Sequence, residues 1–81
     1  MLELIKLSSG DVALVVNDSL VMAGDPALDD VDYVETVAEN LAGALDEALA
    51  RVELKTPEVD DWTWEGLIEE RAVDRALEVP R

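Results

Sequence analysis

Three short apolar runs, separated by turn-forming residues, most constrain what the first third of this chain can fold into. The runs cover residues 2–7, 12–16 and 19–23. Ser8-Ser9-Gly10-Asp11 and Asn17-Asp18 separate them, and Asn and Asp both tolerate the positive φ of a tight hairpin turn. The pattern predicts a three-stranded antiparallel meander. Both faces of the second run are apolar, so we expect one face to pack on a helix and the other to be covered by a second helix or by a partner.

The hydrophobic period changes to 3.6 residues over residues 31–50, which predicts one long helix. Asp29, Asp30 and Asp32 lie at its start and predict N-terminal capping. Asp32 and Glu35 also have the spacing of a capping box. The apolar stripe of this helix comprises Val34, Val37, Ala38, Leu41, Leu45, Ala48 and Leu49.

The remaining elements are shorter. Residues 51–55 alternate with period two and predict a fourth, edge-type strand, and residues 64–78 predict a second helix that ends at Pro80. Arg51 is expected to complement the dipole at the C-terminal end of the first helix. The predicted class is therefore α+β: one domain over residues 1–81, in the order β-β-β-α-β-α, with an antiparallel sheet packed on the long helix.

The charge balance excludes several classes of function. The chain carries 20 acidic and 6 basic residues and no His, which gives a net charge of −14 at pH 7. Phosphate contacts depend on Lys and Arg, so neither direct nucleic-acid binding nor adsorption to anionic membranes is expected. The absence of Cys and His excludes thiol nucleophiles, imidazole bases and the usual zinc sites. Without a Gly-rich phosphate loop either, we expect a binding protein with no cofactor and no metal, and not an enzyme.

Targeting signals are equally sparse. The N-terminal residues lack the basic region and long apolar stretch of a signal peptide, and no segment approaches the length of a membrane span. We expect a soluble, cytoplasmic protein. Because so small a core has no disulfide or metal to support it, we expect either a marginally stable monomer or a homodimer.

Acidic residues concentrate where basic ones are missing, because no Lys or Arg occurs between Lys6 and Arg51. Five carboxylates are predicted to form a row on the first helix, opposite the apolar stripe; these belong to Asp32, Glu35, Glu39, Asp46 and Glu47. At 1.5 Å per residue the row covers about 21 Å, with a mean interval of about 4–5 Å. That interval is of the same order as the phosphate spacing along one DNA strand, roughly 3.4 Å.

Three interpretations of these acids are open. A row of acids on a helix is often simply a solvated face that aids solubility. The row could instead imitate a phosphate backbone and occupy a basic groove on another protein. A divalent-cation site around Asp25, Asp29, Asp30 and Asp32 is the third, although the glycine and terminal glutamate of an EF-hand loop are missing.

Two tryptophans follow Asp60-Asp61 and are separated only by Thr63. They either complete the core or provide an exposed interface anchor with an acidic rim, since Trp is enriched at binding hot spots. Residues two apart cannot share one helical face, so we expect Trp64 inside and Trp62 nearer the surface.

A pattern of aliphatic spacing and a Trp-x-Trp motif runs through nearly the whole chain: Val12–Val16, Asn17, Leu20-Val21-Met22, Asp25-Pro26, Val34-x-x-Val37-Ala38-Glu39-Asn40-Leu41-Ala42-x-Ala44-Leu45-Asp46, Pro57 and Asp61-Trp62-Thr63-Trp64. This pattern resembles small orphan proteins of phages, prophages and plasmids. The resemblance implies a non-enzymatic protein similar in kind to anti-CRISPR and anti-restriction proteins, several of which are DNA mimics.

We therefore expect an inhibitor from a mobile element that presents its acidic helix face to the basic groove of a host nucleic-acid-processing protein or ribonucleoprotein. The predicted partner-binding residues are Asp29, Asp30, Asp32, Glu35, Glu39, Asp46, Glu47, Asp60, Asp61 and Trp62. The alternative is a small prophage adaptor or antitoxin-like protein that binds through apolar sheet surface and Trp62.

Overall fold

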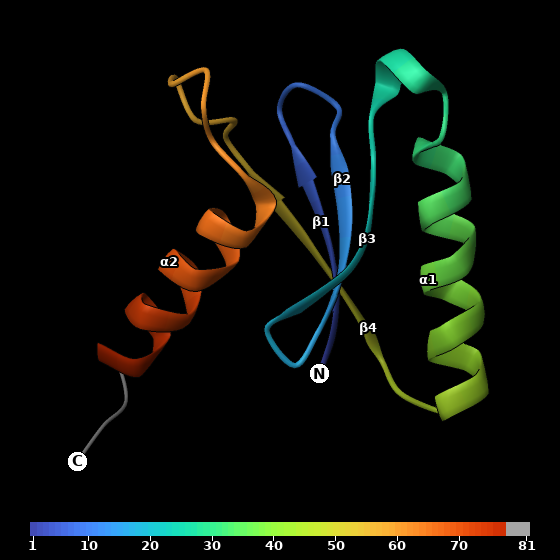
Figure 1. Cartoon of the computed structure of the whole chain (residues 1–81). Coiled ribbons are helices and arrows are strands. Elements are labelled where there is room, and N and C mark those ends of the chain that lie inside the picture. Colours follow the sequence, from blue (N-terminus) through green and yellow to red (C-terminus); the bar gives the residue numbers. More distant parts are fainter. Residues whose placement is uncertain (78–81) are drawn as a thin grey trace.

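The computed structural model describes residues 1–77 and has the predicted α+β class and element order (Figure 1). The predicted end of the second helix, at residues 78–80, lies outside the described residues. The elements are β1 (Leu2–Leu7), β2 (Val12–Val16), β3 (Ser19–Gly24), the short 3-10 helix η1 (Pro26–Leu28), α1 (Val31–Leu45), β4 (Leu49–Leu54) and α2 (Trp64–Leu77).

The first three strands form the predicted antiparallel meander. Leu4 of β1 pairs with Leu14 of β2, and Leu14 in turn pairs with Met22 of β3. Asn17 and Asp18 make the β2–β3 turn with φ values of 50° and 65°. Two consecutive positive φ values are what a two-residue hairpin loop requires, so the Asn-Asp dipeptide accounts for this turn.

The fourth strand corrects the prediction of a wholly antiparallel sheet. β4 pairs with β1 in parallel, with Leu2 opposite Leu49, and the strand order is β3-β2-β1-β4. The sheet is therefore mixed. The physical reason is the connection: α1 carries the chain across the sheet from the β3 edge to the β1 side, and a helical crossover joins strands that run in the same direction.

The predicted long helix is also shorter than expected. It ends at Leu45, and Asp46 has a φ of 52°, with its N–H directed to the carbonyl oxygens of Ala42 and Gly43. Leu49, predicted to extend the helical stripe, instead packs on the same core from β4. Arg51 lies on β4 and not at the helix end. Backbone pairing with β1 satisfies this segment as a strand, which overrides its helical periodicity.

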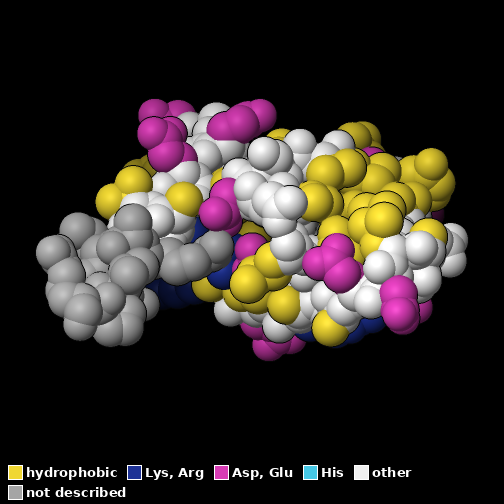
Figure 2. All heavy atoms as spheres, turned by 90° about the horizontal axis from the view of Figure 1, so that it is seen from below, with side chains coloured by type: hydrophobic (Ala, Val, Ile, Leu, Met, Phe, Trp, Pro, Cys, Tyr) yellow, Lys and Arg dark blue, Asp and Glu magenta, His cyan; other side chains and the backbone are white. Residues whose placement is uncertain are grey.

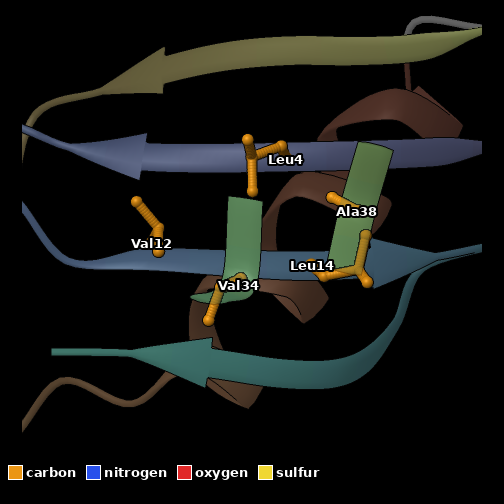
Figure 3. Packing of buried hydrophobic residues seen from close by; sticks show 5 residues of the cluster. All are labelled: Leu4, Val12, Leu14, Val34 and Ala38. Carbon is orange, nitrogen blue, oxygen red and sulfur yellow. The ribbon is translucent and has the colours of Figure 1, made fainter. Parts of the chain in front are cut away.

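One hydrophobic cluster lies between the sheet and α1 (Figure 3). Leu4, Val12 and Leu14 point from the sheet toward Val34 and Ala38 of α1, and each of the five is at most 3% exposed. This contact is the core that the long helix was predicted to build.

A second cluster lies on the other face of the sheet, beneath α2. It comprises Ile5, Leu7, Ala13, Val15 and Ile68. Glu3, on the same face, is only 4% exposed, and its Oε2 accepts a hydrogen bond from Arg71 Nη2 of α2 at 3.0 Å. The face for which we expected a helix or a partner is therefore covered by α2.

Candidate partner-binding site

Three connections meet at one end of the sheet (Figure 1): the β1–β2 turn, the β3–α1 connection and the β4–α2 loop. Ser8 Oγ accepts a hydrogen bond from Thr56 N at 3.0 Å, and Thr56 Oγ1 accepts one from Ser9 N at 2.9 Å. A Cβ added to Gly10 would lie 3.2 Å from Cγ of Pro26, so the β3–α1 connection touches the same turn. We call this region, residues 8–11, 25–32 and 55–63, the acidic loop end.

The acidic loop end carries half of the net charge of the chain. Its single cation is Lys55, against eight carboxylates at Asp11, Asp25, Asp29, Asp30, Asp32, Glu58, Asp60 and Asp61. Lys55 Nζ lies 3.4 Å from Glu58 Oε1, and both side chains are more than 80% exposed. The other seven carboxylates form no ion pair with a cation of the described residues, so the region presents a strongly negative field to solvent.

Local geometry explains why the acids at the start of α1 are held near this end. Asp25 caps η1, since its Oδ1 accepts from Ala27 N at 2.9 Å. Asp29 adopts the left-handed conformation, with φ 59°. Asp30 is the N-cap of α1 but makes no capping hydrogen bond; its Oδ1 accepts from Asp25 N instead. The predicted capping box on Asp32 is therefore wrong, because α1 begins at Val31 and Asp32 already lies in its first turn.

The predicted row of five carboxylates does not form, because α1 ends too early. Asp46 and Glu47 lie beyond the last helical residue, at the end of the sheet opposite to the acidic loop end. Glu47 Oε1 lies 3.8 Å from the N-terminal ammonium group. These two acids are thus separated from Asp32 by the length of the helix.

Glu35 and Glu39, in the middle of the predicted row, lie beside basic side chains. Arg51 Nη2 lies 3.2 Å from Glu39 Oε1. Glu35 lines a small cavity together with Lys6 and Arg51. Lys6 lies two residues after Leu4 on β1, and Arg51 lies opposite Leu4 on β4, so both side chains project on the α1 side of the sheet. The sequence predicted the fourth strand but not its partner, and therefore did not reveal this arrangement.

The two tryptophans share one environment, contrary to the prediction that only Trp64 would be inside. Both are half-buried against the second cluster, and their rings meet edge to face, with centroids 5.5 Å apart at 84°. Thr63 explains the arrangement: its Oγ1 accepts from Gly66 N at 3.0 Å, so it lies just before α2. Trp62 precedes the helix, and the restriction on residues two apart in a helix does not apply to it.

A pocket of about 280 Å³ opens beside Trp62, where the β4–α2 loop meets α2. It is lined by Pro57, Val59, Asp61, Trp62, Thr63, Gly66, Leu67 and Glu70. Asp61 and Trp62 were predicted site residues. Val59, Leu67 and Glu70 were not predicted site residues. Leu67 and Glu70 are three residues apart on a predicted helix, and this spacing could have placed these two on one helical face.

The opposite end of the molecule differs in character. Figure 2, seen from that end, shows hydrophobic side chains gathered over its α1 half, with acidic side chains scattered around them. Met1 and Leu45 are the large exposed hydrophobic residues there, at 61% and 52% exposure. The acidic loop end has exposed hydrophobic residues of its own, Leu28 at 72% and Val59 at 57% exposure, so the two ends differ chiefly in their density of carboxylates.

The described residues contain no group of three or more acidic side chains that could hold a metal ion. None of the described helices is both long enough and apolar enough to cross a membrane.

Fold and site together define a small α+β protein with a helix on each face of its sheet and a negatively charged end. Comparison with protein families, with curated proteins and with solved structures finds no match for this chain.

Proposed function

We propose that this chain is a non-enzymatic inhibitor that presents the acidic loop end to the basic groove of a host nucleic-acid-processing protein or ribonucleoprotein. The observation that carries the proposal is that eight carboxylates, with Lys55 as the single basic side chain among them, gather at one end of the sheet in a protein of 81 residues. Such grooves are lined by Lys and Arg that neutralise phosphates, and these side chains attract a carboxylate surface in the same way. The resemblance to small phage, prophage and plasmid proteins of the anti-CRISPR and anti-restriction kind supports the same class of activity.

The proposed surface differs from the helix face on which the sequence first placed it. Glu35 and Glu39 share their surroundings with Lys6 and Arg51, which weakens the field of α1 along its length. Among the described residues, no basic group lies within ion-pair distance of Asp29, Asp32 or Asp60. The loop end therefore offers the denser and less compensated set of carboxylates.

The alternative function, an adaptor that binds through apolar sheet surface, loses its main support. It needs an exposed apolar sheet face, whereas α1 and α2 each cover one face of the sheet. A homodimer stays a prediction, and the exposed Met1 and Leu45 mark where its interface would be sought.

The test begins with capture of the partner from host lysate at low and high ionic strength, followed by affinity measurements with the purified partner. We compare two triple variants that remove the same charge: Asp29→Asn, Asp32→Asn and Asp60→Asn at the acidic loop end, and Asp46→Asn, Glu47→Gln and Glu69→Gln elsewhere. Exposed ion pairs contribute up to about 1 kcal/mol each, so the first triple should weaken binding about tenfold and the second by less than about twofold.

Two further readouts belong to the same experiment. Affinity should fall steeply with added salt, and the partner's own nucleic acid should compete with the protein. Binding that is insensitive to salt, that is not displaced by nucleic acid, or that weakens equally in both triple variants would refute the proposal.

A further inference from the structure

We infer that the pocket beside Trp62 binds a single basic side chain, that of an arginine, of the partner protein. The inference rests on the proposed function for the existence of a basic partner, and it adds a defined contact to the general attraction of the acidic loop end. The volume of the pocket, about 280 Å³, lies just below the range of roughly 300–1,000 Å³ typical of pockets that take whole small molecules. The size suits one long side chain.

The lining of the pocket matches the two parts of an arginine side chain. Val59, Trp62 and Leu67 supply an apolar wall for the methylene stem. Asp61 and Glu70 supply two carboxylates, and none of the lining residues that the structure describes is basic. Guanidinium groups form bidentate hydrogen bonds with carboxylates and stack on aromatic rings, and Trp is the aromatic residue that attracts cations most strongly.

The structure also holds this lining in place before any partner binds. Trp62 packs against Trp64 and the second hydrophobic cluster, which fixes its indole ring. Thr63 caps α2 through Gly66, so the loop that carries Asp61 is tied to the helix that carries Glu70. A preformed pocket loses less conformational entropy on binding than a mobile surface does.

The position of the pocket adds to the charge argument. It lies at the side of the acidic loop end, next to exposed Asp60 and Glu58. A basic groove drawn to these carboxylates would bring its arginine side chains to the mouth of the pocket. Trp62 and its surroundings would then form the anchored centre of an interface whose rim is acidic.

The test uses a short peptide and no partner, so its result is independent of the proposed function. The probe is the blocked tripeptide acetyl-Gly-Arg-Gly-amide, titrated into the full chain at low salt and followed by the NMR signals of the Trp62 indole N–H and of residues 59–70. We expect saturable shifts with a dissociation constant on the order of 1 mM, as a few exposed ionic and apolar contacts provide. The same peptide with citrulline in place of arginine keeps the shape but lacks the charge, and it should bind at least about fivefold more weakly.

A matched pair of double variants separates the pocket from the general field. Asp61→Asn with Glu70→Gln removes the two pocket carboxylates and should weaken peptide binding about tenfold. Asp60→Asn with Glu69→Gln removes the same charge from exposed neighbours outside the pocket and should change binding by less than about twofold. The single variants Asp61→Asn and Glu70→Gln repeat the comparison if the first double variant does not fold.

Equal losses in the two double variants, equal binding of the citrulline peptide, or no shift of the Trp62 indole signal would each overturn the inference. Such a result would leave the proposed function standing if the partner still bound in a salt-dependent way. Conversely, peptide binding at Trp62 with no effect of the loop-end triple variant on the partner would retain the pocket and remove the proposed function.

Discussion

The ion pair between Glu3 and Arg71 gives the most informative stability experiment in this protein. Glu3 lies on β1, on the sheet face beneath α2, with its side chain 5% exposed, and Arg71 reaches it from α2 with 25% exposure. Arg71→Met removes the cation that lies 3.0 Å from the buried Glu3 carboxylate and keeps most of the length of the side chain. We expect a large loss of stability.

The structure sets the size of that loss. At 3.0 Å, two unit charges attract each other by about 5 kcal/mol at an effective dielectric constant of 20, and desolvation of the pair cancels much of this gain. Removing one partner of a fully buried pair typically costs about 3–5 kcal/mol. Since Arg71 is partly exposed, we expect the lower value of about 2–3 kcal/mol. A domain of this length has a total stability of only about 4–12 kcal/mol, so the effect is readily measured.

The measurement is urea unfolding followed by tryptophan fluorescence and circular dichroism, with linear extrapolation to water. Arg51→Met is the matched control: it removes the same charge from the Arg51–Glu39 pair, whose side chains are 56% and 60% exposed, and should cost less than about 1 kcal/mol. Arg71→Met should cost at least about 1 kcal/mol less in a Glu3→Gln background, because the attraction between the two charges is then already removed. The reasoning fails if Arg71→Met costs no more than the control, or if it costs as much in the Glu3→Gln background as in the unmodified chain.

Two further comparisons follow from the packing. Gly43→Ala should stabilise α1 by about 0.5–1 kcal/mol, because an added Cβ meets nothing within 4 Å. Gly24→Ala should instead cost about 1–3 kcal/mol, because its Cβ would lie 2.9 Å from Val34 Cγ2. Equal urea unfolding midpoints for the two variants would contradict this comparison. Ile68→Ala, at 5% exposure, should cost about 2–4 kcal/mol and Val73→Ala, at 52% exposure, less than about 0.5 kcal/mol. Similar losses at both positions in urea unfolding would show that α2 does not dock through Ile68.

Most of the fold could be predicted from local sequence because local chemistry determines it. Asn17-Asp18 accepts the two positive φ values of its turn, and Val34 and Ala38 keep the helical spacing that faces the sheet. The stretch around Leu49 could not be assigned in this way. Its apolar residue fits both a helical stripe and a strand, and only its pairing with Leu2, far away in the sequence, decides between them.

The same distant pairing explains why the candidate site was only partly predicted. Once β4 is parallel to β1, the loops after β1, β3 and β4 all emerge at one end, which brings Asp11 and Glu58 to the acids around η1. A prediction that treated the acids as one helical row could not place them there. Asp61 and Trp62 were predicted site residues and line one pocket, and Glu70 of α2, which was not predicted, lines the same pocket.

The late arrival of β4 has a consequence for how the chain folds. β1 lies inside the sheet, yet one of its two neighbours follows it by more than half of the chain, with Leu2 paired to Leu49. Until residues 49–54 have been synthesised, the meander of β1, β2 and β3 would leave β1 as an open edge strand with mostly apolar side chains on both faces. Pairings of such long sequence separation slow folding, and open apolar edges favour aggregation. The chain is therefore most vulnerable to self-association while residues 25–54 are being synthesised. Those residues include nine acidic side chains and a single basic one, so the negative charge that opposes self-association grows during the same interval.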